Sequence, residues 1–463
     1  MESQSRYSIS YRSVETHQVM DWIRAGQCGN VIGMRGAGKS NFLRFLFHKD
    51  VQQHYLGQKQ ADFLFVLVNL LSLAECTSWG FYELLLTSLL DQIQPPQISS
   101  EALEALTALH REAVHARDTL TAQRAVERGV AILCRSSPSR LILFFDEFDA
   151  AFQQLDPSLF RILRATRDAH KDQIAYVVIT TCDLARLRDD VTERQVEHFY
   201  RLVGRNVCGL GPYNKADAWQ MLTSLADQNA IELDQNVSEQ LIERSGGQAG
   251  LLKAMTSLLW GPQYGGDLVR LNAGINDEPI IARECRKVWE GLAEDERAAL
   301  NSLANEQPVD QQIADWLKFR GMLQKTDPPK LFSPLFELFV QKQAPASSQG
   351  TLIRRSPRLV QINGRRIVTL TDLEFEALCY LYNHRDRVCT KEDLVCAVYR
   401  QQYGIRQGDL TDAMLQTLIS RLREKIEPDR AHPRYVKTVR GEGYRFAEPT
   451  AREQPANHAE RKP

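Results

Sequence analysis

The chain has 463 residues, a hydrophobic fraction of 43%, a charged fraction of 25% and a formal net charge of −1 at pH 7. This length exceeds what one compact core accommodates, so we expect two to four domains. No run approaches the roughly 18 apolar residues of a membrane span. The polar start lacks the features of a signal peptide, so we expect a cytoplasmic protein without a membrane partner. The nine cysteines contain no C-x-x-C pair, which argues against a disulfide framework or a zinc site.

Short apolar runs alternate with longer amphipathic stretches in the first part of the chain. The runs lie at 31–32, 63–68, 141–145 and 175–180. This alternation predicts a parallel sheet wrapped by helices, and we assign residues 1–212 to such an α/β core. Helical spacing with few strand signals follows at 214–260, so we expect a helical lid over 213–280.

A phosphate-binding motif lies between the first strand-like run and an apolar helix. Residues 33–40 read GMRGAGKS and fit the P-loop pattern G-x-x-x-x-G-K-[ST]. In such loops, backbone N–H groups surround the phosphates, the lysine reaches the β and γ oxygens, and the final hydroxyl ligates Mg²⁺. The sequence therefore predicts ATP and Mg²⁺ as cofactors. The cofactor-binding residues expected here are Gly33, Arg35, Gly36, Ala37, Gly38, Lys39, Ser40 and Asn41.

The apolar run at 141–145 ends in two carboxylates, Asp146 and Glu147. We expect Asp146 at the carboxyl edge of its strand, beside the P-loop. There it would hold Mg²⁺ together with Ser40. Glu147 could polarise an attacking water, which predicts a slow ATP hydrolase rather than a passive binder.

The FFDEFD segment, together with the strand-like run YVVITT that follows it, resembles the Walker B and sensor strands of AAA+/STAND P-loop ATPases. The resemblance covers roughly residues 10–340. It implies that Thr181 or Thr180 contacts the γ-phosphate or the water. It also implies that an arginine, Arg205 or Arg201, completes the site of a neighbouring copy in an assembly.

The choice between a STAND switch and a general AAA+ machine stays open at this level. Residues 245–253 resemble the GGxP motif of STAND proteins, with Ala249 where the adenine-facing proline would be. The segment 281–342 contains no histidine, although STAND proteins use one to read the ADP phosphate. Tyr11 and Arg12 are candidates for the adenine side, because related chains carry an arginine shortly upstream of the P-loop.

A second small domain and a linker follow the lid. Residues 281–342 show helical spacing, then a turn with two prolines and a short strand pair, which predicts a winged-helix-like domain. Residues 343–351 are rich in Gln, Ala, Ser and Pro and predict a linker. The polar tail at 449–463 predicts disorder.

The C-terminal part predicts a basic, amphipathic module. Residues 351–450 carry 18 Lys and Arg against 13 Asp and Glu, a surplus of five positive charges. Such a surplus favours a nucleic-acid partner. In the helix expected at 411–426, one apolar stripe leaves a polar face free. The stripe consists of Leu415, Leu418, Ile419, Leu422 and Ile426. Two glycines, Gly441 and Gly443, permit a tight hairpin at 435–446.

Residues 352–448, which contain LTDLEFEALCYLYNHRDRVCTKEDL and RYVKTVRGEGYRF, resemble the winged-helix domain of OmpR/PhoB response regulators. The resemblance implies that the helix at 411–426 lies in the major groove of double-stranded DNA and the wing reaches the backbone. The contacts it implies are Thr417, Ser420, Arg421 and Arg423 on the helix and Lys437, Thr438 and Arg440 in the wing. A winged helix used for protein contact is the alternative.

Taken together, the sequence predicts an α/β P-loop ATPase core with a helical lid, a winged-helix-like domain and an OmpR/PhoB-like winged helix. We expect an ATP-dependent DNA-binding regulator, of transcription, that forms a homo-oligomer on ATP binding. One alternative is an AAA+ DNA-transaction ATPase that helps replication or transposition. The other is a STAND-type signal or defence sensor with an unknown protein or small-molecule trigger.

Overall fold

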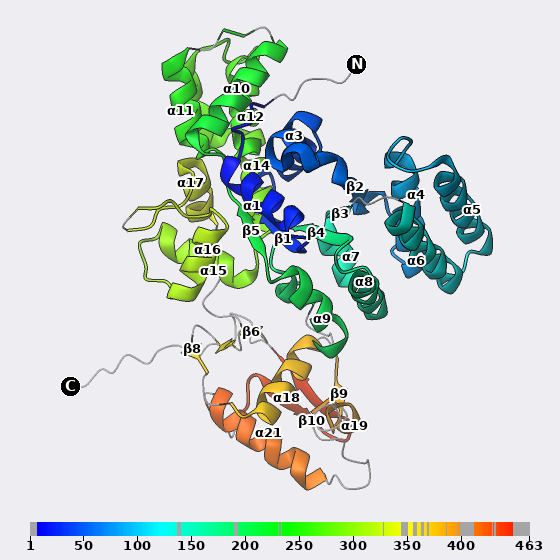
Figure 1. Cartoon of the computed structure of the whole chain (residues 1–463). Helices are drawn as coiled ribbons and strands as arrows, with labels where there is room; N and C mark the ends of the chain where they lie inside the picture. The colour runs from blue at the N-terminus through cyan, green and yellow to red at the C-terminus, as the bar shows by residue number, and fades with distance from the viewer. Residues whose placement is uncertain are drawn as a thin grey trace. The chain divides into compact units, whose positions relative to one another are not determined.

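The structure is a computed structural model of the chain (Figure 1). It describes residues 7–136, 140–188, 193–229, 231–232, 234–326, 328–343, 351–354, 359–362, 365–367, 370–385, 387–395, 397–398, 412–427, 429 and 432–447. The chain divides into two compact units, Met1–Gln343 and Ala344–Pro463. The division falls in the predicted linker, of which 344–350 lie outside the described residues, as does the predicted tail at 449–463. Among the described helices, none is long and apolar enough to cross a membrane.

The first unit is built on a five-stranded parallel sheet with the order β2-β3-β4-β1-β5. Its strands are β1 (Gly29–Gly33), β2 (Phe63–Asn69), β3 (Arg140–Asp146), β4 (Ile174–Thr180) and β5 (Val207–Leu210). Strands β1 and β4 are buried along their whole length, which explains their continuous apolar character. The four predicted strands are confirmed. Strand β5 was not predicted, because its four residues VCGL include a glycine and give a weak strand signal.

Helices cover the sheet and extend from one side of it. The flanking helices are α1 (Ser13–Arg24), α2 (Lys39–Leu46), α3 (Lys49–Leu56), α7 (Phe148–Gln154), α8 (Pro157–Ala169) and α9 (Glu193–Val203). Between β2 and β3 the chain forms α4 (Ser78–Gln92), α5 (Ser100–Ala116) and α6 (Thr119–Ser136), which pack on one another and project from the unit in Figure 1. Phe144 and Phe145 of β3 are fully buried in the core formed by the sheet and the helices that cover it.

The helices expected at 214–260 are confirmed as α10 (Lys215–Asn229), α11 (Gln235–Ser245) and α12 (Ala249–Leu259), followed by α13 (Leu268–Gly274). Four more helices follow: α14 (Pro279–Glu290), α15 (Glu294–Ala304), α16 (Gln311–Phe319) and α17 (Pro334–Lys342). We call residues 279–342 the α14–α17 segment. Leu323 and Leu331 form one isolated antiparallel bridge in it. Helices with a single bridge match only part of a winged-helix outline, so the second winged-helix domain stays a prediction.

The second unit has two small antiparallel sheets. One contains β6 (Thr351–Arg354), β7 (Leu359–Ile362) and β8 (Arg365–Arg366), and the other has the order β10-β11-β9. The remaining elements are α18 (Asp372–Asn383), β9 (Cys389–Thr390), α19 (Lys391–Val395), α21 (Asp412–Ile426), β10 (Val436–Val439) and β11 (Gly443–Phe446). The predicted apolar stripe of α21 is buried in the core of this unit, as expected. Thr411, the predicted first residue of that helix, lies outside the described residues.

The wing of the second unit is the β10–β11 hairpin. Its turn contains Gly441 at φ 81°, a left-handed conformation that favours glycine and confirms the expected tight turn. A Cβ on Gly443 would lie 2.1 Å from the carbonyl oxygen of Cys389, so this position has no room for a side chain. The carboxylate of Glu427 accepts hydrogen bonds from the backbone N–H groups of Tyr435 and Val436 at 2.9 and 2.8 Å. The wing is therefore fixed to the end of α21.

Candidate nucleotide site and DNA-binding surface

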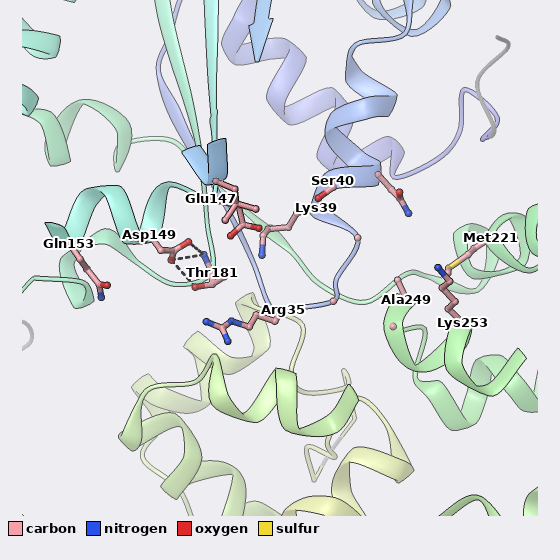
Figure 2. Close-up of a pocket in the computed structure, with 16 residues that line it drawn as sticks. Arg35, Lys39, Ser40, Glu147, Asp149, Gln153, Thr181, Met221, Ala249 and Lys253 are labelled. Atoms are coloured by element: carbon pink, nitrogen blue, oxygen red, sulfur yellow. Dashed lines mark hydrogen bonds between the residues drawn. The ribbon is translucent and has the colours of Figure 1, made fainter. Parts of the chain in front are cut away.

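A cavity of about 620 Å³ lies at the carboxyl edge of the parallel sheet, between the P-loop, the end of β3 and the lid helices (Figure 2). It brings together the predicted residues Arg35, Gly36, Gly38, Lys39, Ser40, Asn41, Glu147 and Thr181. It is also lined by residues that we did not predict, including Asp149, Gln153, Met221 and Lys253. Ala37 and Asp146 are chain neighbours of lining residues, and Gly33 lies two residues before Arg35, but none of the three is itself among the lining residues.

The P-loop needs its glycines for two reasons. Gly36 and Gly38 have φ angles of 76° and 86°, which favour glycine. A Cβ on Gly36 would also lie 2.3 Å from Nε2 of Gln248, and one on Gly38 would lie 2.4 Å from the hydroxyl of Tyr213. Helix α2 begins directly after Gly38, so its first-turn N–H groups, which have no intrahelical partners, lie beside the cavity. This arrangement suits an anionic phosphate group.

Lys39 supplies the cation of this loop. Its Nζ donates to the carbonyl oxygen of Gly33 at 3.1 Å, and the residue is buried. Burial lowers the pKa of Lys39, while the neighbouring carboxylates of Glu147 and Asp149 act in the opposite direction. Figure 2 shows Lys39 beside Glu147 at the cavity. Lys39 therefore places one positive charge beside acidic side chains at the cavity.

The two carboxylates after β3 have different environments. Asp146 is buried, its Oδ1 accepts the backbone N–H of Glu147 at 2.9 Å, and burial raises the pKa of Asp146. Glu147 lines the cavity and has a φ angle of 54°. Glu147 is also the N-cap residue of α7, and a non-glycine residue in this left-handed conformation costs on the order of 1–3 kcal/mol. The strained residue thus lies at the cavity, between the end of β3 and the start of α7.

Thr181 is the sensor candidate that faces the cavity. Its Oγ1 and its backbone N–H donate to the carboxylate of Asp149 at 2.7 and 2.9 Å. Thr180 is fully buried and donates instead to Asn30 at 3.0 Å, which leaves Thr181 as the one of the two that lines the site. Asp149 was missed because its signal, a third acidic residue in FDEFD, is shared with many solvated helix starts.

Arg12 supports the P-loop from behind rather than lining the cavity. The residue is buried, and its guanidinium donates to the carbonyl oxygens of Ala37 and Gly211 at 2.7 and 2.9 Å. The hydroxyl of Tyr11 donates to that of Tyr213 at 2.9 Å. The expectation that Tyr11 and Arg12 face the adenine therefore differs from their positions, since neither is among the cavity-lining residues.

The lid touches the P-loop through the segment that resembles GGxP. Nε2 of Gln248 donates to the carbonyl oxygen of Arg35 at 3.3 Å, and the N–H of Gly250 donates to that of Gly36 at 3.3 Å. Ala249 lines the cavity, as the resemblance implied for this position. The start of α12, in the predicted lid, is thus in direct contact with the P-loop at the cavity.

The two predicted arginines lie away from the cavity within this chain. Arg205 is exposed after the end of α9, and Arg201 pairs with Glu197 at 2.5 Å. Neither is among the cavity-lining residues. Their expected role in the site of a neighbouring copy stays a prediction.

In the second unit, most of the predicted DNA contacts lie on accessible surface. Thr417 and Arg421 are exposed on α21, Thr438 and Arg440 are exposed in the wing, and Ser420 and Lys437 are partly buried. Arg423 differs from the others. Its guanidinium donates to the carbonyl oxygen of Val436 at 2.6 and 2.9 Å and to the hydroxyl of Thr438 at 2.8 Å. These bonds tie α21 to the wing, so Arg423 is already engaged in the absence of DNA.

Comparisons with known proteins agree with this division. The model of the family described as novel STAND NTPase 1 matches residues 10–306, and the family described as transcriptional regulatory protein, C terminal, matches residues 364–446. The alkaline phosphatase synthesis transcriptional regulatory protein PhoP of Bacillus subtilis is 42% identical over 84 residues, or 18% of this chain. The match spans 33% of that relative's length.

Among solved structures, the Walker-type ATPase paby2304 of Pyrococcus abyssi is similar over 71% of this chain and 95% of its own, with 17% identity and a TM-score of 0.44. The DNA-binding domain of Klebsiella pneumoniae RstA, solved in complex with the RstA box, is similar over 21% of this chain and 91% of its own. Its identity is 28% and its TM-score is 0.18.

Proposed function

The chain belongs to the novel STAND NTPase 1 family, and on that premise we propose that it is an ATP-binding transcription regulator whose nucleotide state controls its C-terminal winged helix. The observation that carries the proposal is the join, in one chain, of a P-loop cavity with an OmpR/PhoB-type DNA-binding unit. In this proposal the first unit binds the nucleotide that controls the protein, and the second unit binds DNA.

The residues of the cavity fit ATP with Mg²⁺. The backbone of the glycine-rich loop and the first turn of α2 suit the phosphates, and Lys39 suits the β and γ oxygens. Ser40 and Asp146 would hold the metal, which neutralises phosphate charge when bound. Glu147 would orient and deprotonate an attacking water, and Thr181 would contact the γ-phosphate or that water. On this basis we propose slow ATP hydrolysis.

In the second unit, α21 would read base edges in the major groove of double-stranded DNA through Thr417, Ser420 and Arg421. Lys437, Thr438 and Arg440 in the wing would contact the backbone. The basic surplus of residues 351–450 favours such binding. ATP-dependent assembly of several copies would raise the effective DNA affinity, because linked winged helices bind together. Arg201 and Arg205 are candidates for completing a neighbour's site in that assembly.

The test is a DNA titration of the full chain with ATP, with ADP and without nucleotide. The duplex is first selected from a random-sequence library by residues 351–450 alone. We expect the full chain to bind that duplex more tightly with ATP than with ADP, by roughly 5-fold or more. The isolated C-terminal unit should be indifferent to nucleotide, and Lys39→Ala should remove the difference in the full chain.

Two outcomes would contradict the proposal, and a third would favour an alternative function. Equal DNA affinities in all three nucleotide states, with nucleotide binding verified by calorimetry, would remove the switch. Absence of any selected duplex would point instead to a winged helix that contacts protein, as in a STAND-type sensor with a protein or small-molecule trigger. Strong stimulation of hydrolysis by DNA would favour a DNA-transaction ATPase.

A further inference from the structure

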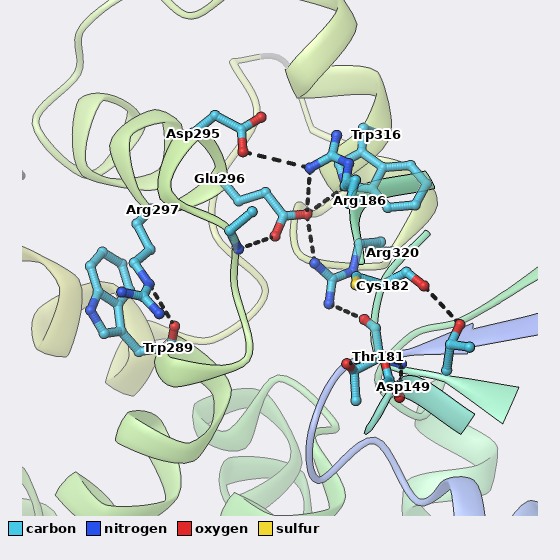
Figure 3. Close-up of polar contacts among 12 residues, drawn as sticks. Asp149, Thr181, Cys182, Arg186, Trp289, Asp295, Glu296, Arg297, Trp316 and Arg320 are labelled. Carbon is cyan, nitrogen blue, oxygen red and sulfur yellow. Dashed lines mark hydrogen bonds and ion pairs between the residues drawn. The ribbon is translucent and has the colours of Figure 1, made fainter. Parts of the chain in front are cut away.

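A buried ionic cluster joins the α14–α17 segment to the loop that follows β4 (Figure 3). At its centre is Glu296 of α15, which is fully buried. Its Oε1 accepts hydrogen bonds from Arg320 at 2.6 Å and from Nε1 of Trp316 at 2.5 Å. Arg186, from the loop after β4, lies 3.4 Å from the same oxygen. Residues from two distant parts of the chain therefore share one carboxylate.

The cluster reaches the nucleotide cavity through Arg320. This residue is 1% exposed and follows the last residue of α16. Its second terminal nitrogen donates to the carbonyl oxygen of Thr181 at 2.6 Å. Thr181 in turn donates from its N–H and its hydroxyl to Asp149, and both Thr181 and Asp149 line the cavity. A continuous set of hydrogen bonds thus runs from Glu296 to the cavity wall.

Electrostatics keep this arrangement fixed. Burial alone would raise the pKa of Glu296, but the guanidiniums of Arg320 and Arg186 outweigh it and hold the pKa below its usual range. The carboxylate therefore stays ionised at neutral pH. Asp295 also lies 3.6 Å from Arg186, so two carboxylates face two guanidiniums. A guanidinium is a planar fork of donors, so the bond to Glu296 also orients the nitrogen that faces Thr181.

The α14–α17 segment meets the site at a second point. A Cβ on Gly291, directly after α14, would lie 3.2 Å from Cδ of Arg35 in the P-loop. Arg35 lines the cavity, and its guanidinium makes no ion pair or hydrogen bond with the residues that the structure describes. A nucleotide phosphate that attracts this guanidinium would therefore change the position of a side chain that packs against the α14–α17 segment.

We propose that Arg320, held by Glu296, is a positioning residue that couples the occupant of the cavity to the α14–α17 segment. The inference rests on the proposed nucleotide binding. It specifies how a difference in bound nucleotide is transmitted from the cavity to the α14–α17 segment. A bound nucleotide and its cation compete for the carboxylate of Asp149, which changes its bonds to Thr181. The change reaches Arg320 through the Thr181 carbonyl and then reaches Trp316 through Glu296.

Trp316 makes the coupling measurable, because its indole N–H is part of the cluster. The full chain, with six tryptophans, is labelled with 5-fluorotryptophan, and its ¹⁹F resonances are recorded with MgATP, with MgADP and without nucleotide. Trp316→Phe identifies the Trp316 resonance. We expect this resonance to take different positions with ATP and with ADP. Calorimetry on the same sample measures the affinity for each nucleotide.

The critical variant is Arg320→Lys. Lysine keeps the charge beside Glu296, but it lacks the fork that bonds two acceptors at once. We expect the Trp316 resonance to lose its response and the ratio of ATP to ADP affinity to change by about 5-fold or more. The matched control is Arg297→Lys on α15, next to Glu296 in the chain; its guanidinium bonds the carbonyl oxygens of Trp289 and Glu290 outside the cluster. This control should keep the wild-type response.

Other outcomes separate the inference from the function on which it rests. If the wild-type chain binds both nucleotides and the Trp316 resonance does not move, the coupling is wrong while nucleotide binding stands. If the Trp316 resonance of Arg320→Lys responds to the nucleotides as in the wild type, the coupling is likewise wrong. If Arg320→Lys does not fold, Thr181→Val serves in its place, because it keeps the side-chain shape and removes the hydroxyl bond to Asp149. Absence of nucleotide binding in the wild type would reject the proposed function itself.

Discussion

Arg12 donates a hydrogen bond from its guanidinium to the carbonyl oxygen of Ala37 at 2.7 Å, although 25 residues separate them in the sequence. The same guanidinium bonds the carbonyl oxygen of Gly211, and the backbone N–H of Arg12 bonds Asp217 at the start of the lid. One buried residue thus connects the P-loop to the end of β5 through its side chain and to α10 through its backbone N–H. The shape of the phosphate-binding loop depends on a residue outside its motif.

We predict that Arg12→Lys weakens ATP binding about 10-fold or more. Lysine keeps the charge, but it lacks the rigid guanidinium plane in which Nη2 bonds both carbonyl oxygens while Nη1 bonds Glu15 at 3.2 Å. A lost charged hydrogen bond costs about 1.5–3 kcal/mol. Calorimetry measures the affinity. The control is Arg24→Lys, because Arg24 also bonds a backbone carbonyl, that of Tyr55. Equal affinities in the two variants would show that the Arg12 bond is not needed for the loop.

Glu147→Gln should leave ATP binding within about 2-fold of the wild type and slow hydrolysis by roughly 10²–10⁴-fold. The substitution keeps the shape of the side chain and removes the group that accepts the proton of water. Phosphate release at saturating ATP measures the turnover. Glu83→Gln, on α4 outside the cavity, should hydrolyse ATP at the wild-type rate. Unchanged turnover in Glu147→Gln would exclude this residue as the base.

Residues 351–450 alone should bind duplex DNA with an affinity that falls steeply as salt increases, because the excess positive charge releases counterions. Arg440→Ala should weaken all sequences alike, since the wing contacts backbone, whereas Thr417→Ala should change sequence preference. Fluorescence anisotropy on a panel of duplexes checks both. Arg385→Ala removes one charge outside α21 and the wing and serves as the control. Uniform losses in all variants would refute the placement of α21 in the groove.

Arg423→Ala should destabilise the free C-terminal unit by about 1–3 kcal/mol, because it removes the bonds from α21 to Val436 and Thr438. Chemical denaturation of residues 351–450 without DNA measures the free energy of unfolding. Arg421→Ala lies two residues earlier at an exposed position and should change that free energy by no more than about 0.5 kcal/mol. Similar changes in the free energy of unfolding for both variants would show that these bonds do not stabilise the unit, and Arg423 would again be a candidate for DNA contact.

Glu374 gives the C-terminal unit a predictable response to acid. Its side chain is buried, and burial alone would raise its pKa, but Lys425 at 2.6 Å and the backbone of Thr371 lower it. A lowered folded-state pKa means that its stabilisation is complete above the ordinary glutamate pKa of about 4.3 and is lost as pH falls through the folded value. We predict that Glu374→Gln reduces stability by about 1–3 kcal/mol at pH 7 and shows a flatter dependence between pH 5 and pH 3.

Denaturation of residues 351–450 at several pH values tests this response. Glu392→Gln, at the exposed start of α19, is the matched control and should keep the wild-type slope. An unchanged slope in Glu374→Gln would mean that the ion pair with Lys425 does not contribute to folding.

The sequence by itself predicted the features that depend on local pattern. The P-loop motif predicted residues that line the cavity, because Gly36, Gly38, Lys39 and Ser40 occupy fixed positions along one short segment. The apolar run before Asp146 determined a buried strand that ends at the site. The stripe that begins at Leu415 determined the buried face of α21, because helical spacing alone selects that face.

Only the tertiary structure decided which distant groups meet. A buried guanidinium must find acceptors, but its own sequence does not say whether they are backbone carbonyls or carboxylates. Arg12 bonds the P-loop and Arg423 bonds the wing. Arg320 bonds both Glu296 and Thr181, the latter 139 residues away in the chain. Each partner is selected by packing between elements, because hydrogen bonds of buried charges form only where the folded backbone brings both groups within about 3 Å.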